Sequence, residues 1–259
     1  NLSGSCLAYL FAKQLDENKD LANLAIVGMV GDMLDKNIGK IGNSIINDAE
    51  VVIKKGLMLY PATRPINKAL EFSSSIYIPG VTGSPSGAVS FLREAGIENE
   101  NGEYKSLMDL NEEEMSKIIT SILLRVNQKD AHEIIGNIYL VKVRNKLEDA
   151  RELSAMINAC SRLDNSAVAF SLCLGSKEAR SRAESIYAKY KQHLISALNY
   201  VSSTNKIEGK DYVIINAQGN IKDTIIGTIA SILSMSCAYK AGTTIIAMAH
   251  NEDKIKISA

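Results

Sequence analysis

Apolar residues recur with a helical period over the first fifteen positions. They are Leu7, Leu10, Phe11 and Leu15. Ser3 and Ser5 precede them and can accept hydrogen bonds from the unpaired N–H groups of a first turn, so the pattern predicts an amphipathic helix. Asp20 is then expected to cap a second, almost wholly apolar stretch over residues 21–31, which ends at Asp32. A carboxylate that follows a buried run is costly unless it is paired, protonated or bound to a metal.

Between residues 60 and 144 the periodicity is broken by turns. All four prolines of the chain lie here, together with Gly80, Gly83 and Gly87. Within this region, residues 86–95 and 111–126 keep a helical apolar stripe, and Asn111 stands where it can cap the second of these helices. The pattern predicts a compact subdomain that the chain enters and leaves through loops.

The remaining third returns to regular elements. Residues 138–143 are short and β-branched, which predicts a strand, and helices are expected over 150–163, 166–174 and 177–201. The end of the chain alternates predicted strands at 212–215, 243–249 and 254–257 with a predicted helix at 223–238. This rhythm indicates an α/β fold.

Composition narrows the function classes. The chain has 259 residues, 46% of them hydrophobic, and Lys plus Arg equal Asp plus Glu at 29 each, so its overall field attracts neither nucleic acid nor an anionic membrane. Any contact with nucleic acid must therefore be local. The four cysteines form no CxxC pair, which favours a reducing cytoplasm, and no apolar run reaches the roughly 20 residues of a membrane helix. Because the chain opens on Asn1-Leu2-Ser3-Gly4, without a start methionine or a signal peptide, we expect it to be an excised piece.

Other potential sites are weak. His132, His193 and His250 lack metal-ligand spacing and match no nucleophile motif, so solvated or capping roles are expected. The stretch over residues 80–87 is rich in glycine but lacks the lysine of a phosphate-binding loop, and it is expected to be a turn that leads into a helix.

Taken together, seven segments in order resemble the archaeal RecJ-like exonucleases of the DHH phosphoesterase family, known as GINS-associated nucleases. The segments are residues 2–13, 27–32, 63–65 with 69–71, 77–84, 91–92 to 96–97, 157–163 and 223–233. The resemblance implies a DHH catalytic domain with two divalent metals, Mn²⁺ or Mg²⁺, that activate water against a phosphodiester, followed by a DHH-associated domain.

Of the metal ligands that the resemblance implies, only the aspartate after the hydrophobic helix maps onto this chain, at Asp32. The early aspartates and the Asp-His-His motif would lie before Asn1, and the glycine- and histidine-rich motif would lie after Ala259. No catalytic set is therefore complete, and the isolated chain is expected to be inactive. Without the resemblance, Asp32 is an ordinary aspartate at a helix end, and Asp35 is taken as a surface residue.

The resemblance also implies that Arg162 contacts a nucleic-acid phosphate, with Asn158 one helical turn earlier on the same face. Ser161 stands where the family has glycine, which leaves the arginine in place but changes the local turn. The alternative is a structural Arg162 that pairs with Asp164 or Glu152.

The segment Pro61–Asn137 resembles the insert that docks a GINS subunit, and the alternative is a stabilising lobe without a partner. We therefore expect four parts: 1–60, the end of the DHH domain; 61–137, a helical partner-binding insert; 138–202, a return to the DHH core with a long connecting helix; and 203–259, the start of the DHH-associated domain. The whole would belong to a single-stranded DNA or RNA exonuclease without a membrane attachment. Two other functions stay open, namely a nuclease-dead scaffold related to the eukaryotic helicase component and a DHH phosphodiesterase of short oligonucleotides.

Overall fold

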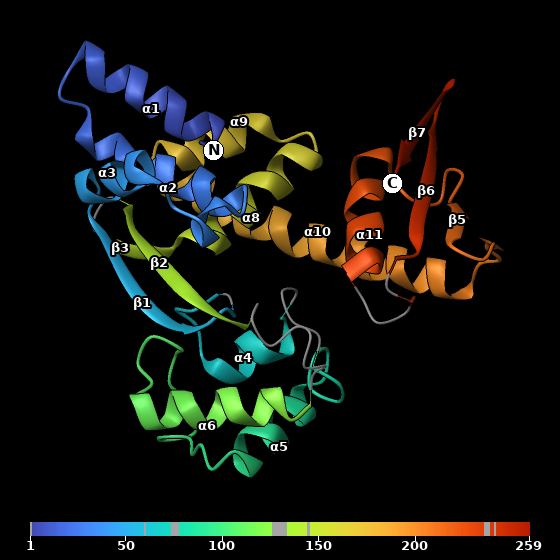
Figure 1. The fold of residues 1–259 in the computed structure, drawn as a ribbon, viewed down its shortest axis with the longest axis horizontal. Helices are drawn as coiled ribbons and strands as arrows, with labels where there is room; N and C mark the ends of the chain where they lie inside the picture. The colour runs from blue at the N-terminus through green and yellow to red at the C-terminus, as the bar shows by residue number, and fades with distance from the viewer. Residues whose placement is uncertain are drawn as a thin grey trace. The chain divides into compact units, whose positions relative to one another are not determined.

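The computed structural model describes residues 2–59, 61–73, 78–125, 134–143, 146–235, 239–240 and 242–259. The chain divides into two compact units, Asn1–Ala155 (unit 1) and Met156–Ala259 (unit 2), and each combines helices with a sheet (Figure 1). The expected α/β class is confirmed. No helix among the described residues is long and apolar enough to cross a bilayer.

Unit 1 begins with three helices, α1 (Gly4–Leu15), α2 (Ala22–Gly31) and α3 (Lys40–Asp48). The hydroxyl of Ser3 accepts a hydrogen bond from the Cys6 N–H at 3.2 Å and caps α1 as expected. The expected cap at Asp20 is wrong, because this residue lies in a short 3₁₀ turn and α2 begins without a side-chain cap.

The buried face of α1 differs from the apolar stripe that its sequence suggests. Cys6 and Tyr9 are buried against the rest of the unit, whereas Leu7, Phe11 and Leu15 are 56%, 68% and 70% exposed. Small residues at the contact explain the difference, since the Ser5 hydroxyl and Cys6 thiol both donate to the Ala25 carbonyl and draw α1 close to α2.

A three-stranded antiparallel sheet follows, formed by β1 (Val51–Leu57), β2 (Ile135–Val143) and β3 (Lys146–Asp149) in that order. Its register pairs Val51 with Val141 and Leu140 with Asp149. The predicted strand at 138–143 is confirmed and extends three residues earlier. Between β1 and β2 the chain forms a helical lobe, described over residues 61–73 and 78–125, which contains α4 (Ile66–Glu71), α5 (Pro85–Glu94) and α6 (Glu112–Leu123).

The apolar core of the helical lobe continues into the sheet, since it includes Leu57 of β1 and Ile138 and Leu140 of β2. Six of its fully buried side chains are Ile66, Leu70, Phe91, Leu92, Ile118 and Ile122. Asn111 and Glu114 form a reciprocal capping box at α6, as the sequence predicts, while Val126 of the predicted helix lies outside the described residues. The 80–87 stretch leads into α5 as expected, and a Cβ on Gly87 would stand 1.9 Å from the Gly80 carbonyl oxygen, so only glycine fits there.

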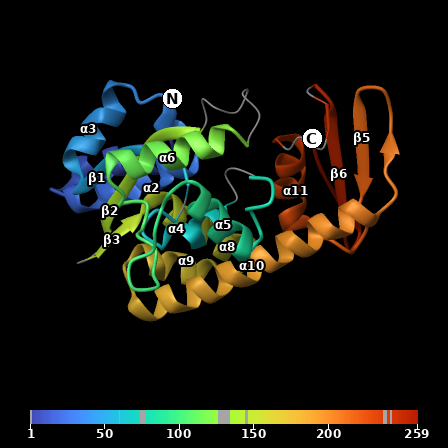
Figure 2. The ribbon, with the colours of Figure 1, turned by 90° about the horizontal axis from the view of Figure 1, so that it is seen from below.

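Unit 2 contains the end of α8 (Ala150–Arg162), then α9 (Ser166–Cys173) and the long α10 (Lys177–Ser203). Its sheet runs β4 (Ile207–Glu208), β5 (Tyr212–Asn216), β6 (Thr244–Asn251) and β7 (Lys254–Ser258). Strands β5 and β6 are parallel and are connected through α11 (Asp223–Met235), which packs against β6 and β7 (Figure 2). The predicted helices and strands are confirmed, apart from residues 236–238, which lie outside the described part of the chain.

Candidate functional site: the Asp32 turn and its support

Asp32 caps the C-terminus of α2. Its N–H donates to the Gly28 carbonyl at 2.9 Å, and Met33 follows in the left-handed conformation with φ 56°, so the chain turns sharply at this point. The Asp32 side chain is exposed, and it makes no hydrogen bond or ion pair with the residues that the structure describes. Because unpaired carbonyls give a helix C-terminus a partial negative charge, the carboxylate and the helix end together favour a cation at this position.

Two glycines just before this turn allow α2 to pack closely against α1 and against α8. A Cβ on Gly28 would lie 2.0 Å from the Ser5 hydroxyl of α1, and a Cβ on Gly31 would lie 2.2 Å from the Ser154 hydroxyl of α8. The glycine immediately before Asp32 therefore lets the end of α2 rest directly on the beginning of α8. This contact fixes the backbone that carries the exposed carboxylate.

Asp35 is buried, so its expected surface position is wrong. Its side chain is 2% exposed, and its Oδ2 accepts a hydrogen bond at 2.7 Å from the guanidinium of Arg151, which lies in the first turn of α8. Its Oδ1 is buried and has no partner among the described residues. The pair ties the far end of the Asp32 turn to the same helix that Gly31 contacts.

Asp149 holds the first turn of α8 in place. One oxygen, Oδ1, accepts from the N–H groups of Arg151 at 2.8 Å and Glu152 at 3.2 Å, which is the geometry of a helix N-cap. The other oxygen accepts from the Ala62 N–H at 2.8 Å. Burial raises the pKa of Asp149 above its ordinary value, against the opposing effect of these three N–H donors and of the Arg151 charge.

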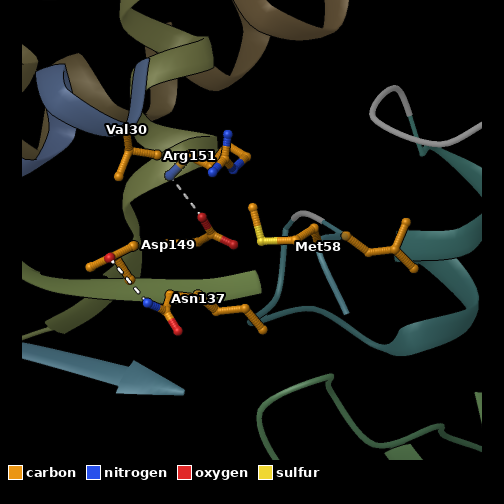
Figure 3. Close-up of a pocket in the computed structure, with 8 residues that line it drawn as sticks. Val30, Met58, Asn137, Asp149 and Arg151 are labelled. Atoms are coloured by element: carbon orange, nitrogen blue, oxygen red, sulfur yellow. Dashed lines mark hydrogen bonds between the residues drawn. The ribbon is translucent and has the colours of Figure 1, made fainter. Parts of the chain in front are cut away.

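A pocket lies beside these groups (Figure 3). It is lined by Val30, Met58, Leu59, Asn137, Ile138, Tyr139, Asp149 and Arg151. In the close-up, Arg151 lies next to Asp149 through its backbone N–H, and Asn137 is bonded to the Tyr139 hydroxyl at 3.4 Å. Burial raises the pKa of Tyr139, so this phenol is a neutral wall of the pocket.

A second ionic contact joins α8 to the helical lobe. The Arg64 guanidinium donates to Glu152 at 2.6 Å, and the Glu152 side chain is 5% exposed. Glu152 is therefore engaged by Arg64, and its suggested pairing with Arg162 is wrong.

Arg162 and Asn158 both lie in unit 2, near the end of α8, and both are exposed. The Arg162 guanidinium donates at 2.8 Å to the carbonyl of Thr224 in the first turn of α11. A guanidinium has five N–H donors, so this bond leaves donors for an anion. The phosphate-binding role of Arg162 and Asn158 stays a prediction.

Asp32 is the one exposed carboxylate described at this turn, so by itself it could supply only part of a divalent metal site. Carboxylate oxygens suit Mn²⁺ and Mg²⁺, which take about six ligands, and one carboxylate supplies at most two. No group of three metal-ligating side chains occurs within the described part of the chain. His193 lies half-buried in α10, His250 is exposed on β6, and His132 lies outside the described residues.

Sequence reasoning did not identify Asp149, Arg151 or Glu152 as part of this site. One local signal was available, since an aspartate immediately before a predicted helix, with a glutamate three residues on, resembles a capping pattern. The partners of these residues could not be inferred, because Asp35 is 116 positions from Arg151 and Ala62 is 87 positions from Asp149.

Comparisons with known proteins find one domain match and two similar chains. Residues 59–135 match the model of the DHH-CID domain, a range that largely overlaps the expected insert at 61–137. An uncharacterized protein of Methanocaldococcus jannaschii is 29% identical over 236 residues, which cover 90% of this chain and 50% of that protein. The crystal structure of CDC45 from Entamoeba histolytica has a TM-score of 0.58 with 11% identity, over 91% of this chain and 55% of that one. The likeness to CDC45 shows a shared fold, and the chain spans about half the length of both proteins.

Proposed function

We propose that the chain is the core and partner-docking portion of a RecJ-like, metal-dependent exonuclease that degrades single-stranded DNA or RNA and associates with the replicative GINS complex. The observation that carries the proposal is the Asp32 turn. An exposed carboxylate ends a buried helix, and close packing and an ion pair hold its backbone on both sides. The DHH-CID match and the CDC45-like fold support the relation to this class of proteins.

In this proposal Asp32 would be one ligand of a divalent metal site, and the other ligands would come from DHH motifs before Asn1. The metal would supply an activated water and would stabilise charge on the phosphodiester. This chain's own residues would contribute a fixed carboxylate at Asp32 and a guanidinium at Arg162 that orients a phosphate. Asn158 would assist Arg162 on the same helix face.

The helical lobe would dock the partner. Its apolar core is continuous with side chains of β1 and β2, so the sheet supports the lobe and its outer surface can serve binding. The lobe is inserted in the sequence between β1 and β2, which pair with each other, and it is attached to α8 through the Arg64–Glu152 pair.

The test joins this chain to the DHH half that the resemblance places before Asn1. We expect Mn²⁺-dependent release of nucleotides from single-stranded DNA, and we expect Asp32→Asn to reduce it by more than about 100-fold, since even groups outside the ligand shell cost about 10–100-fold. Arg162→Ala should weaken binding of single strands. Nuclease activity of the 259-residue chain by itself, above a mock preparation, would contradict the proposal that the other metal ligands come from the DHH half.

A second candidate is a replication scaffold without nuclease activity, which the fold shared with CDC45 favours. Titration of a GINS subunit into this chain, followed by calorimetry, is expected to show binding for either candidate. Binding in a protein whose joined DHH half releases no nucleotides would support the scaffold, and absence of binding would leave the helical lobe a stabilising element.

A further inference from the structure

The first turn of α8 contacts two functional parts of unit 1 at once. On one side, Arg151 bonds to Asp35 and Ser154 lies against Gly31, so both ends of the Asp32 turn rest on this helix. On the other side, the lobe segment at residues 62–64 is bonded to the same helical turn.

The lobe-side contacts are two short polar bonds. The Ala62 N–H donates to Asp149 at 2.8 Å, and the Arg64 guanidinium donates to Glu152 at 2.6 Å. Asp149 and Glu152 are 3% and 4% exposed, whereas the Arg64 side chain is 48% exposed, so the Ala62–Asp149 bond is the better shielded from water. A buried donor or acceptor that loses its partner carries the full desolvation penalty, and these bonds therefore transmit displacement rather than yield to it.

Asp149 is the residue at which the two sides meet. Its Oδ1 closes the first turn of α8, on which Arg151 depends for its position, and its Oδ2 holds Ala62. We propose that Asp149 is a positioning residue, through which the helical lobe and the Asp32 turn are coupled, so that loss of its bonds alters how the Asp32 carboxylate is presented to a metal ion. The inference rests on the proposed function for the role of Asp32, whereas the coupling itself is a property of the fold.

Variants at position 149 separate the two bonds. Asp149→Ser keeps a hydroxyl that caps α8 but cannot hold Ala62, while Asp149→Ala loses both bonds. Arg151→Met removes only the contact with the Asp32 turn. Glu71→Gln is a matched control, because Glu71 is a buried carboxylate of the lobe that pairs with Lys68 and touches neither segment.

Hydrogen exchange of backbone amides in the 259-residue chain, resolved by peptide, tests the coupling. Asp149→Ala should accelerate exchange about tenfold or more in both the 31–36 turn and residues 62–66, because both lose their support. Asp149→Ser should accelerate only residues 62–66, Arg151→Met only the 31–36 turn, and Glu71→Gln should leave the turn unchanged. Uniform acceleration through α1 and β1 in Asp149→Ala, or acceleration of one segment alone, would overturn the proposal.

A Mn²⁺ titration tests whether Asp149 positions the Asp32 carboxylate for a metal ion. In the protein joined to its DHH half, Asp149→Ala should raise the half-saturating Mn²⁺ concentration about 10-fold or more, with turnover at saturating Mn²⁺ retained. An unchanged half-saturating concentration would overturn the positioning role. If Asp32→Asn has no effect while the exchange pattern appears, the proposed function fails and the coupling stands. If Asp32→Asn abolishes activity while exchange is uniform, the coupling fails and the function stands.

Discussion

Replacing Arg151 by methionine should destabilise unit 1 more than replacing its partner. Asp35 is 2% exposed with one oxygen already unpartnered, whereas the Arg151 side chain is 20% exposed. Removal of one partner from a buried ion pair costs about 3–5 kcal/mol, and the partial exposure of Arg151 places Arg151→Met near about 3 kcal/mol. Asp35→Asn should cost less, about 1–2 kcal/mol, because the freed guanidinium can reach water.

Urea unfolding followed by circular dichroism measures these differences, provided that the slope against denaturant stays constant. The double variant Asp35→Asn/Arg151→Met should be no less stable than Arg151→Met, since the buried charge is gone. Lys117→Met is the control, because its pair with Glu113 is exposed and its loss should leave the urea midpoint nearly unchanged. A loss in free energy of unfolding under about 1 kcal/mol for Arg151→Met would contradict a buried ion pair. A larger loss for Asp35→Asn than for Arg151→Met would contradict it as well.

Three further predictions concern the helical lobe and α1. Asn111→Ala removes half of the capping box of α6 and should lower the free energy of unfolding by about 1 kcal/mol, and an unchanged urea midpoint would contradict the cap. Gly87→Ala places a Cβ 1.9 Å from a backbone oxygen and should cost at least about 1–3 kcal/mol, so a neutral result would show that the turn before α5 is misjudged. Burial, and then the hydrogen bond to Asp48, raise the pKa of Tyr9 from 10.0 to about 12, so the folded state holds this proton more tightly. That stability is complete below pH 10.0 and is lost as the pH rises to about 12, and Tyr9→Phe should flatten this part of the stability curve.

Local signals predicted α5 and α6 of the lobe and the α/β order of unit 2, whereas the short α4 was not predicted. The cap at Asn111 and the apolar period of α6 are contained in one short stretch, so no distant residue is needed to define them. Strand β1 was not predicted, because Lys54 and Lys55 interrupt its apolar run. Lys54 is accommodated by donating to the carbonyls of Met108 and Leu110, over 50 positions away.

The site was less visible in the sequence than the fold. Asp32 was singled out through the family resemblance, since its position after a buried helix also suits an ordinary helix-end aspartate, and the structure shows it exposed at the end of that helix. Asp35 was misjudged as a surface residue, because its burial depends on Arg151, which only the tertiary fold brings near. The buried face of α1 also depends on the tertiary fold. Close packing between Ser5 and Gly28 decides which face of the helix is buried, and its apolar stripe stays exposed.

The most direct test of the account is Mn²⁺ binding and turnover at Asp32, in the protein that joins this chain to its DHH half. Asp20→Asn is the matched control, because Asp20 is an exposed acid near the opposite end of the same helix. We predict that Asp32→Asn loses tightly bound Mn²⁺ in calorimetry and more than about 100-fold of nucleotide release, while Asp20→Asn keeps both. Equal Mn²⁺ binding and equal turnover in the Asp32→Asn, Asp20→Asn and unaltered proteins would contradict the account.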